Sequence, residues 1–337
     1  MKRKYKRLIF RIISCLVAFV LAVLAAFFFT HRKVVENIEA IEISESTLPV
    51  IEVQTGGSYL NLMCGYTNDM IDRYMRGAVT PLPADRQLKI RITQGDEVVK
   101  GIRFEVRSLD STELLENTKV TEWKEKSDDT KSVITAILPI QNLLEKDREY
   151  KLTIYLETEH HEEICYFTRV ISSEKLSTAK MVDFVKNFHN KTLDSANASG
   201  MAVYLRSNTD TSASLGFVSL NSSYSKLLWN YLNPREIKGS TLEIIDINQT
   251  IGTFLMNSSV RFTDANGLDH DCDVEEVFTV QLSNGSWYML NYERTANESL
   301  VQEKLRNGST SLPLGIVYDE RVHVLNSEKG LRQSSSD

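Results

Sequence analysis

The sequence of 337 residues predicts an N-terminal transmembrane helix, then an all-β sandwich, then an α+β module built on an antiparallel meander. Three observations support this fold class. An apolar run without charges lies near the start of the chain, and apolar and polar side chains alternate with a period of two over residues 86–171. An amphipathic helical pattern is then followed by long strands joined by Asn-Gly pairs.

The transmembrane helix is predicted at residues 12–29, eighteen residues without a charge. Eighteen helical residues rise about 27 Å, close to the bilayer hydrocarbon thickness of about 30 Å. Six Lys or Arg in residues 2–11, against two just after the run, favour a cytoplasmic N-terminus. We therefore expect a single-pass signal anchor in the lipid bilayer of the cell membrane, with the C-terminal bulk extracytoplasmic. A signal peptide cleaved near Val23-Leu24-Ala25 is the alternative, and the length of the apolar run favours the anchor.

Charge and cysteine content narrow the range of possible functions. After residue 33 the chain holds 31 basic and 45 acidic residues, a net charge of −14, which argues against a nucleic-acid partner. Three cysteines follow the apolar run: Cys64, Cys165 and Cys272. Because three is an odd number, we expect either one disulfide and a spare thiol or three reduced thiols. No Cys-x-x-Cys pair is present, and no cofactor is predicted.

Residues 84–172 are predicted to form the β-sandwich, because alternation places one row of side chains in a core and the other in water. Leu144 and Tyr150 precede one of the alternating runs by the spacing of a tyrosine corner. This segment resembles fibronectin type III and related immunoglobulin-like domains, although Lys146 and Arg148 replace the usual Pro and Thr. The resemblance implies that Leu144 packs beneath the turn and that the Tyr150 hydroxyl ties the turn to the sandwich.

Residues 173–325 are predicted to pair one amphipathic helix with an antiparallel sheet. One face of this helix carries the apolar residues Met181, Phe184, Val185 and Phe188. Asn266-Gly267 and Asn284-Gly285 predict the turns of the meander, because Asn-Gly tolerates positive φ at both central positions. The remaining segments are expected to be a cytoplasmic basic tail (1–11), a juxtamembrane stalk and linker (30–83) and a disordered tail (326–337).

The most conspicuous polar feature is an acidic strand with carboxylates at Asp269, Asp271, Asp273 and Glu275. A spacing of two puts them on one face of a strand, where several hard oxygens would suit Ca²⁺ or Mg²⁺. These four are the candidate metal ligands. An EF-hand loop is excluded, since its sixth position, a glycine, would fall on Val274. The alternative is a solvated outer face beside a hairpin turn.

Two further patterns contain metal-ligating residue types. Asp269-His270-Asp271 and Asp271-Cys272-Asp273 match Asp-x-Asp, which resembles the metal–nucleotide motif of Golgi glycosyltransferases, but the chain lacks the alternating strands and helices of that fold. His160-His161-Glu162-Glu163 offers imidazole and carboxylate ligands, or is a polar hairpin tip. No G-x-S-x-G or H-E-x-x-H motif occurs, so no catalytic residue is assigned.

These observations favour a non-catalytic, membrane-anchored binding or accessory protein of the cell envelope. It would act on a membrane or envelope protein partner, as a regulator or an assembly subunit. The alternative is an anchored envelope enzyme, either a hydrolase or a metal-dependent glycosyltransferase that uses the strand from Asp269 to Glu275. A cleft around Asp269, Asp271 and His270 would favour the enzyme, and a convex sheet surface would favour binding. Whether the eight Asn-x-Ser/Thr triplets of the second half are glycosylated is left open.

Overall fold

The structure is a computed structural model in which the chain divides into two units, Met1–Glu45 and Ser46–Asp337. The described residues all belong to the second unit. They comprise 48–299, without 69–76, 110–112, 128–131, 143, 174–175, 207–209, 211–213, 265–266, and the backbone of 322–327 and 330–335.

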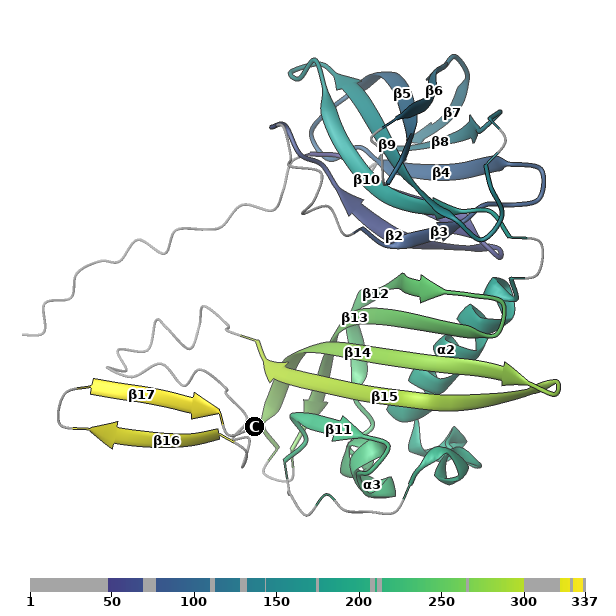
Figure 1. Ribbon diagram of the computed structural model, residues 1–337. Helices are drawn as coiled ribbons and strands as arrows, with labels where there is room; N and C mark the ends of the chain where they lie inside the picture. Colours follow the sequence, from purple (N-terminus) through teal and green to yellow (C-terminus); the bar gives the residue numbers. More distant parts are fainter. Residues whose placement is uncertain are drawn as a thin grey trace, which may run out of the picture. The chain divides into compact units, whose positions relative to one another are not determined.

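Two five-stranded sheets contain the segment with the period of two (Figure 1). The first, in the order β2-β1-β4-β8-β7, consists of β1 (Val50–Thr55), β2 (Ser58–Cys64), β4 (Gln87–Thr93), β7 (Trp123–Ser127) and β8 (Ser132–Pro139). The second, in the order β3-β10-β9-β5-β6, consists of β3 (Val79–Pro81), β5 (Val99–Ser108), β6 (Leu114–Val120), β9 (Glu149–Thr158) and β10 (Ile164–Ile171). Neighbouring strands are antiparallel except β3 and β10.

The alternation in the sequence corresponds to alternating burial in both sheets. Leu88, Ile90 and Ile92 of β4 are fully buried, and so are Phe104 of β5 and Ile154 of β9. All five belong to one hydrophobic cluster. Burying a large apolar side chain stabilises a fold by about 1.5–3 kcal/mol, so these rows account for much of the stability of the two sheets. Strands β1, β2 and β3 also join these sheets, although they fall in the range assigned from sequence to stalk and linker.

The turn before β9 contains the hydrogen bond expected of a tyrosine corner. The backbone N–H of Glu145 donates to the Tyr150 hydroxyl at 3.0 Å. Tyr150 is buried, and Leu144 packs against the core from a partly buried position. Asp147, within the turn, has a positive φ of 57°. The link between turn and sheet is therefore present, while membership of the fibronectin type III or immunoglobulin-like class stays a prediction.

A third five-stranded sheet, in the order β11-β15-β14-β13-β12, follows the helix α2 (Thr178–Leu193). Its strands are β11 (Phe217–Ser219), β12 (Arg235–Ile247), β13 (Ile251–Thr263), β14 (Asp269–Ser283) and β15 (Ser286–Glu298), all antiparallel. The short helices are η2 (Ser195–Asn197), η3 (Met201–Tyr204), α3 (Tyr224–Leu227) and η4 (Trp229–Tyr231). A separate hairpin pairs β16 (Val322–Ser327) with β17 (Gly330–Ser335).

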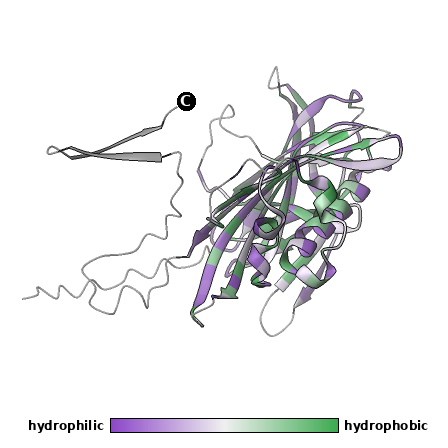
Figure 2. Cartoon of the chain, turned by 90° about the horizontal axis from the view of Figure 1, so that it is seen from below, coloured by the Kyte–Doolittle hydropathy of each residue, from purple (hydrophilic) through white to green (hydrophobic). Residues whose placement is uncertain are grey.

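Helix α2 covers one face of the third sheet (Figure 1). Met181, Val185 and Phe188 are buried on its apolar side. The Phe188 ring lies 6.0 Å from the ring of Phe278 on β14 and 5.0 Å from that of Tyr292 on β15. Figure 2 shows hydrophobic and hydrophilic residues interspersed along both strands and helices, as one-sided burial requires.

The two hairpin turns of the meander differ in length. Asn284 and Gly285, with φ of 50° and 77°, form the predicted two-residue turn between β14 and β15. Between β13 and β14 the loop spans residues 264–268, closed by Asp264, whose carbonyl and carboxylate accept the N–H groups of Gly267 and Leu268. Asn266 lies outside the described residues.

The predicted fold class is wrong in its first element. The described part of the chain is mostly β-sheet, with three sheets rich in antiparallel strands and few helices. None of the helices in that part has the length and apolar character needed to cross a membrane. Residues 12–29 lie outside the described residues. Hydropathy reports the cost of exposing a segment to water and does not by itself establish a spanning helix. The single-pass topology and the extracytoplasmic localisation deduced from it are therefore withdrawn.

The cysteine alternatives are also resolved for the described residues. Cys64, Cys165 and Cys272 are not joined by disulfide bonds. Cys64 is exposed on β2, whereas Cys272 is buried on β14. The three-thiol alternative therefore holds, and the fold depends on packing rather than on a covalent crosslink.

The β1–β2 turn offers a test of packing against α2. Gly56 has a φ of 60°, and a Cβ added there would lie 2.6 Å from the Cβ of Ala179. We expect Gly56→Ala to lower the free energy of unfolding by about 2–4 kcal/mol, through left-handed strain and the collision. Gly57→Ala is the matched control, because Gly57 also has a positive φ but no atom within 4 Å of an added Cβ. It should cost only about 1–2 kcal/mol. Equal losses in urea titrations of the two variants would contradict this packing.

Candidate functional site

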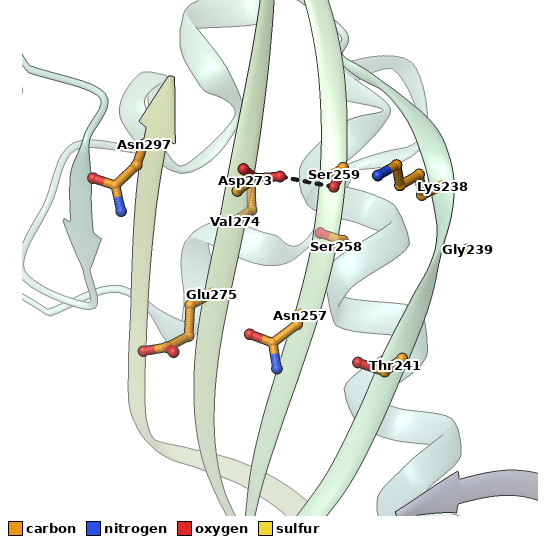
Figure 3. A pocket seen from close by; sticks show the side chains of 10 residues that line it. All are labelled: Lys238, Gly239, Thr241, Asn257, Ser258, Ser259, Asp273, Val274, Glu275 and Asn297. Atoms are coloured by element: carbon orange, nitrogen blue, oxygen red, sulfur yellow. Dashed lines mark hydrogen bonds between the residues drawn. The ribbon is translucent and has the colours of Figure 1, made fainter. Parts of the chain in front are cut away.

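A shallow hollow of about 420 Å³ lies on the face of the third sheet that α2 does not cover (Figure 3). Strands β12, β13, β14 and β15 all contribute to its lining. The lining residues are Lys238, Gly239, Thr241, Asn257, Ser258, Ser259, Asp273, Val274, Glu275 and Asn297.

The strand register brings these side chains together. Asn257 on β13 pairs with Glu275 on β14, Ser259 pairs with Asp273, and Asp273 pairs in turn with Asn297 on β15. Side chains at directly paired positions are about 4.5–5.5 Å apart at their Cβ atoms. The residues between them in sequence point toward the core, so these polar side chains share the outer face.

A β-bulge on the edge strand β12 shapes one wall of the hollow. Lys238 pairs with Ser259 and Thr241 pairs with Asn257, so Gly239 and Ser240 on β12 together oppose a single residue of β13. The extra residue bends the strand locally. Residues 235–240 are all exposed, and a Cβ added at Gly239 would meet no atom within 4 Å. The hollow is therefore open at this wall.

Most polar side chains of the hollow have no hydrogen-bond or ion-pair partner among the described residues. Asp273 accepts a hydrogen bond from the Ser259 hydroxyl at 2.9 Å (Figure 3). Within the described part of the chain, no side chain hydrogen-bonds or ion-pairs with Lys238, Asn257, Glu275 or Asn297. The hollow therefore offers donors and acceptors of both charge signs to a ligand.

The four predicted metal ligands share one face of β14, as their spacing indicates, but they do not act together. Asp271 forms a two-pronged ion pair with Arg261 of β13, at 2.5 and 2.6 Å. Asp269 accepts a hydrogen bond from the hydroxyl of Thr263 at 2.6 Å. Only Asp273 and Glu275 reach the hollow. Among the residues described, no three His, Cys, Asp or Glu side chains are placed to hold one metal ion.

The Asp-x-Asp pattern does not form a cleft with its histidine. The His270 ring stacks on Phe262 with centroids 5.2 Å apart. Its two nitrogens lie 3.5 Å from a carboxylate oxygen of Asp264 and 3.4 Å from one of Glu298. As the residue between Asp269 and Asp271, His270 points to the opposite face of the strand.

His160 and His161 form the polar tip of the β9–β10 hairpin. Their Nδ1 atoms lie 3.4 and 3.3 Å from Oε1 of Glu97, which the loop between β4 and β5 contributes. Burial acts to raise the pKa of Glu97, but hydrogen bonds from Thr158 and His160 hold it below its usual value. Glu163 instead pairs with Arg103 at 2.9 Å. The four residues of the sequence pattern therefore do not converge, and Glu97 could not be identified from sequence.

Sequence reasoning missed a polar network behind the hollow, in which His189, Glu276 and Tyr292 are buried and Glu236 lies on the exposed edge strand. His189 of α2 hydrogen-bonds Glu276 of β14 through Nδ1 and Glu236 of β12 through Nε2, the latter at 3.1 Å. Tyr292 of β15 donates to Glu276 at 2.7 Å. Glu236 also bonds Ser240 of the bulge. The sequence feature that could have indicated this network is His189, a histidine next to Phe188 on the apolar face of the helix.

The electrostatics of this network favour the charged forms of His189, Glu276 and Glu236. Burial lowers the pKa of His189, but the two carboxylates outweigh it and raise the pKa to about 10. Burial would raise the pKa of Glu276, yet His189 and the Tyr292 hydroxyl hold it below its usual value. The hydrogen bond from His189 likewise lowers the pKa of Glu236. An imidazolium between two carboxylates thus ties α2 to two strands.

Arg294 of β15 is a second buried charge that sequence reasoning missed. Its guanidinium donates to the carbonyls of Lys226 and Leu227, at 2.9 and 3.0 Å, and lies 3.8 Å from the Trp229 ring centroid. Trp229, Asn230 and Tyr231 all have positive φ, which costs about 1–2 kcal/mol per residue. Arg294 therefore helps to hold a strained left-handed turn. The sequence feature that could have indicated it is an arginine among the β15 residues whose side chains point toward the core.

Comparisons with known proteins do not place the chain in a family. No protein-family model matches the chain, and no curated protein sequence is similar to it. Among solved structures, the chain is similar to Spo0M, a sporulation control protein from Bacillus subtilis, with 9% identity and a TM-score of 0.20. The match covers 77% of this chain and 93% of that chain. A TM-score this low supports no argument about fold or function.

The His189 network predicts the pH dependence of stability. The pKa of His189 is higher in the folded chain, so its contribution is complete below its unfolded pKa of about 6.5 and is lost as pH rises through about 10. The pKa values of Glu276 and Glu236 are lowered, so their contributions are lost as the pH falls below about 4.5. Stability from the network should therefore be greatest between about pH 4.5 and 6.5.

Urea unfolding at several pH values tests this pH dependence, with His189→Gln as the comparison. The variant should lose the decline between pH 6.5 and 10 and be less stable below about pH 10, because two carboxylates lose their cation. Val203→Gln, at a position that is 77% exposed and carries no titratable group, is the control and should keep the wild-type profile. An unchanged alkaline slope in His189→Gln would contradict the assignment.

Proposed function

We propose that the chain is a non-catalytic binding or accessory protein that holds its ligand in the hollow on the third sheet. The observation that carries the proposal is a set of polar side chains: Lys238, Asn257, Glu275 and Asn297 line the hollow without intramolecular partners among the described residues. A role as a regulator or as an assembly subunit is consistent with such a site.

The form of the hollow supports a partner or polymer rather than an enclosed small molecule. Small-molecule sites usually bury 70–90% of the ligand surface and are mostly apolar. Here Lys238, Asn257, Asp273, Glu275 and Asn297 are all exposed at the surface of a sheet. A ligand on this face would keep one side in water, as a chain passing over the surface does.

The geometry does not favour the enzyme alternative. That alternative required a cleft formed by Asp269, Asp271 and His270, and His270 lies on the opposite face of the strand from both carboxylates. Asp271 is held by Arg261 in a two-pronged ion pair. General acid–base or metal chemistry needs groups that converge on one reacting atom, and these three do not.

Site-specific crosslinking tests the proposal. A photo-crosslinking amino acid replaces Thr241 in the full chain, which is irradiated in the producing cells, and adducts of any chemical class are identified by mass spectrometry. We expect an adduct at position 241 that is lost when Gly239→Trp fills the hollow. The backbone should accept a side chain here, because a Cβ at 239 meets no neighbour within 4 Å, and the unfolding midpoint of the variant checks that it folds.

The matched control places the same crosslinker at Lys119, which is exposed on β6 of the second sheet. The adduct should not form at position 119. No specific adduct at 241, or an adduct that persists in Gly239→Trp, would overturn the proposed site. Release of a chemically altered ligand by the wild-type protein would instead support the enzyme.

A further inference from the structure

We infer that the ligand of this hollow is a neutral, hydroxyl-rich saccharide chain, an inference that rests on the proposed binding function. The argument starts from hydrogen-bonding capacity. Asn257 and Asn297 each offer two amide donors and an acceptor oxygen, Glu275 offers only acceptors, and Lys238 offers only donors. A sugar hydroxyl both donates and accepts, so neighbouring hydroxyls can use amides and a carboxylate on the same surface.

The spacing of these groups suits a repeating ligand. Asn257 and Glu275 are directly paired on adjacent strands, and so are Asp273 and Asn297. The lining extends over four strands, from Lys238 on β12 to Asn297 on β15. With neighbouring strands about 4.7–4.9 Å apart, this path is about 14–15 Å long. A single ring would engage only part of such a path, whereas a chain of several sugars would span it.

The charges disfavour a strongly charged polymer. Asp273 and Glu275 line the hollow, so a polyanion would meet like charge there. A polycation would meet Lys238 at the wall that the bulge opens. Mixed charges beside neutral amides are best matched by a ligand that is itself uncharged.

The lining also sets the expected strength of binding. Its ten residues include no aromatic ring on which a sugar could stack. A hydrogen bond that replaces one to water strengthens binding only about two- to tenfold. Affinity for a short chain should therefore be weak, with a dissociation constant on the order of 1 mM, and tight retention would need several sites along one polymer.

Titration of the full chain with three uncharged hexasaccharides tests the inference. The probes are the β-linked hexamers of glucose and of N-acetylglucosamine and the α-linked hexamer of glucose, followed by amide chemical shifts up to about 10 mM. We expect at least one to bind and to shift signals on β12 to β15. Asn257→Ala and Asn297→Ala should each weaken binding about fivefold. Gly239→Trp should abolish it.

Lys119→Trp is the matched control and should bind like wild type, since it adds the same ring at an exposed strand position outside the hollow. Unfolding midpoints of all variants establish that they fold. If one of the two Asn→Ala variants does not fold, the other still serves as the test. The inference is overturned if no hexasaccharide binds, or if binding survives in Gly239→Trp. If the crosslinker at Thr241 captures a peptide while these probes fail, the saccharide is rejected and the binding function stands.

Discussion

The packing of β13, β14 and β15 against α2 is the constraint on which the rest of the second module depends. Phe254, Phe278 and Tyr292 are fully buried beneath the helix. Because successive side chains on a strand point to opposite faces, burying these rows forces the rows between them into solvent. A register shift of one residue would bury Asp273 and Glu275 and expose the aromatic rings, so the core itself fixes the position of the hollow.

The sequence determined the features that depend on local periodicity. Alternation identified the paired strands of residues 86–171, and the Asn284-Gly285 turn formed as predicted, because a two-residue hairpin needs positive φ at both positions. The shared face of Asp269 to Glu275 also followed from spacing alone. The transmembrane prediction used local hydropathy in the same way, and no spanning helix is found in the part of the chain that the structure describes.

The features that could not be predicted are those that depend on register between distant strands. Whether a carboxylate of β14 is committed depends on what faces it on β13: Arg261 engages Asp271, and Asn257 leaves Glu275 available. The hollow requires the bulge at residues 239–240, which local propensity does not place. His189 and Glu276 are 87 residues apart in sequence, and neither carries a motif that would link them. These contacts are tertiary, so a single sequence contains no direct signal for them.

The buried contacts of His189 and of Arg294 are better understood as specifying geometry than as sources of stability. Replacing a buried ion pair by apolar residues is often neutral or stabilising, whereas removing one partner is costly. His189 accepts only an arrangement in which β12 and β14 both present a carboxylate to α2. Arg294 likewise requires the two carbonyls at the end of α3. Together they define how the helical segments sit on one face of the sheet whose other face carries the hollow.

The bulge on β12 has a consequence for self-association. An edge strand with free backbone groups is a template on which another chain can add a strand and begin to aggregate. Part of β12 is already covered, since the Asn61 amide oxygen accepts the N–H of Ile244. The uncovered part carries Arg235, Glu236 and Lys238 and is kinked by the bulge, features that hinder edge-to-edge pairing. One irregularity therefore both opens the hollow and hinders edge-to-edge strand pairing between copies of the chain.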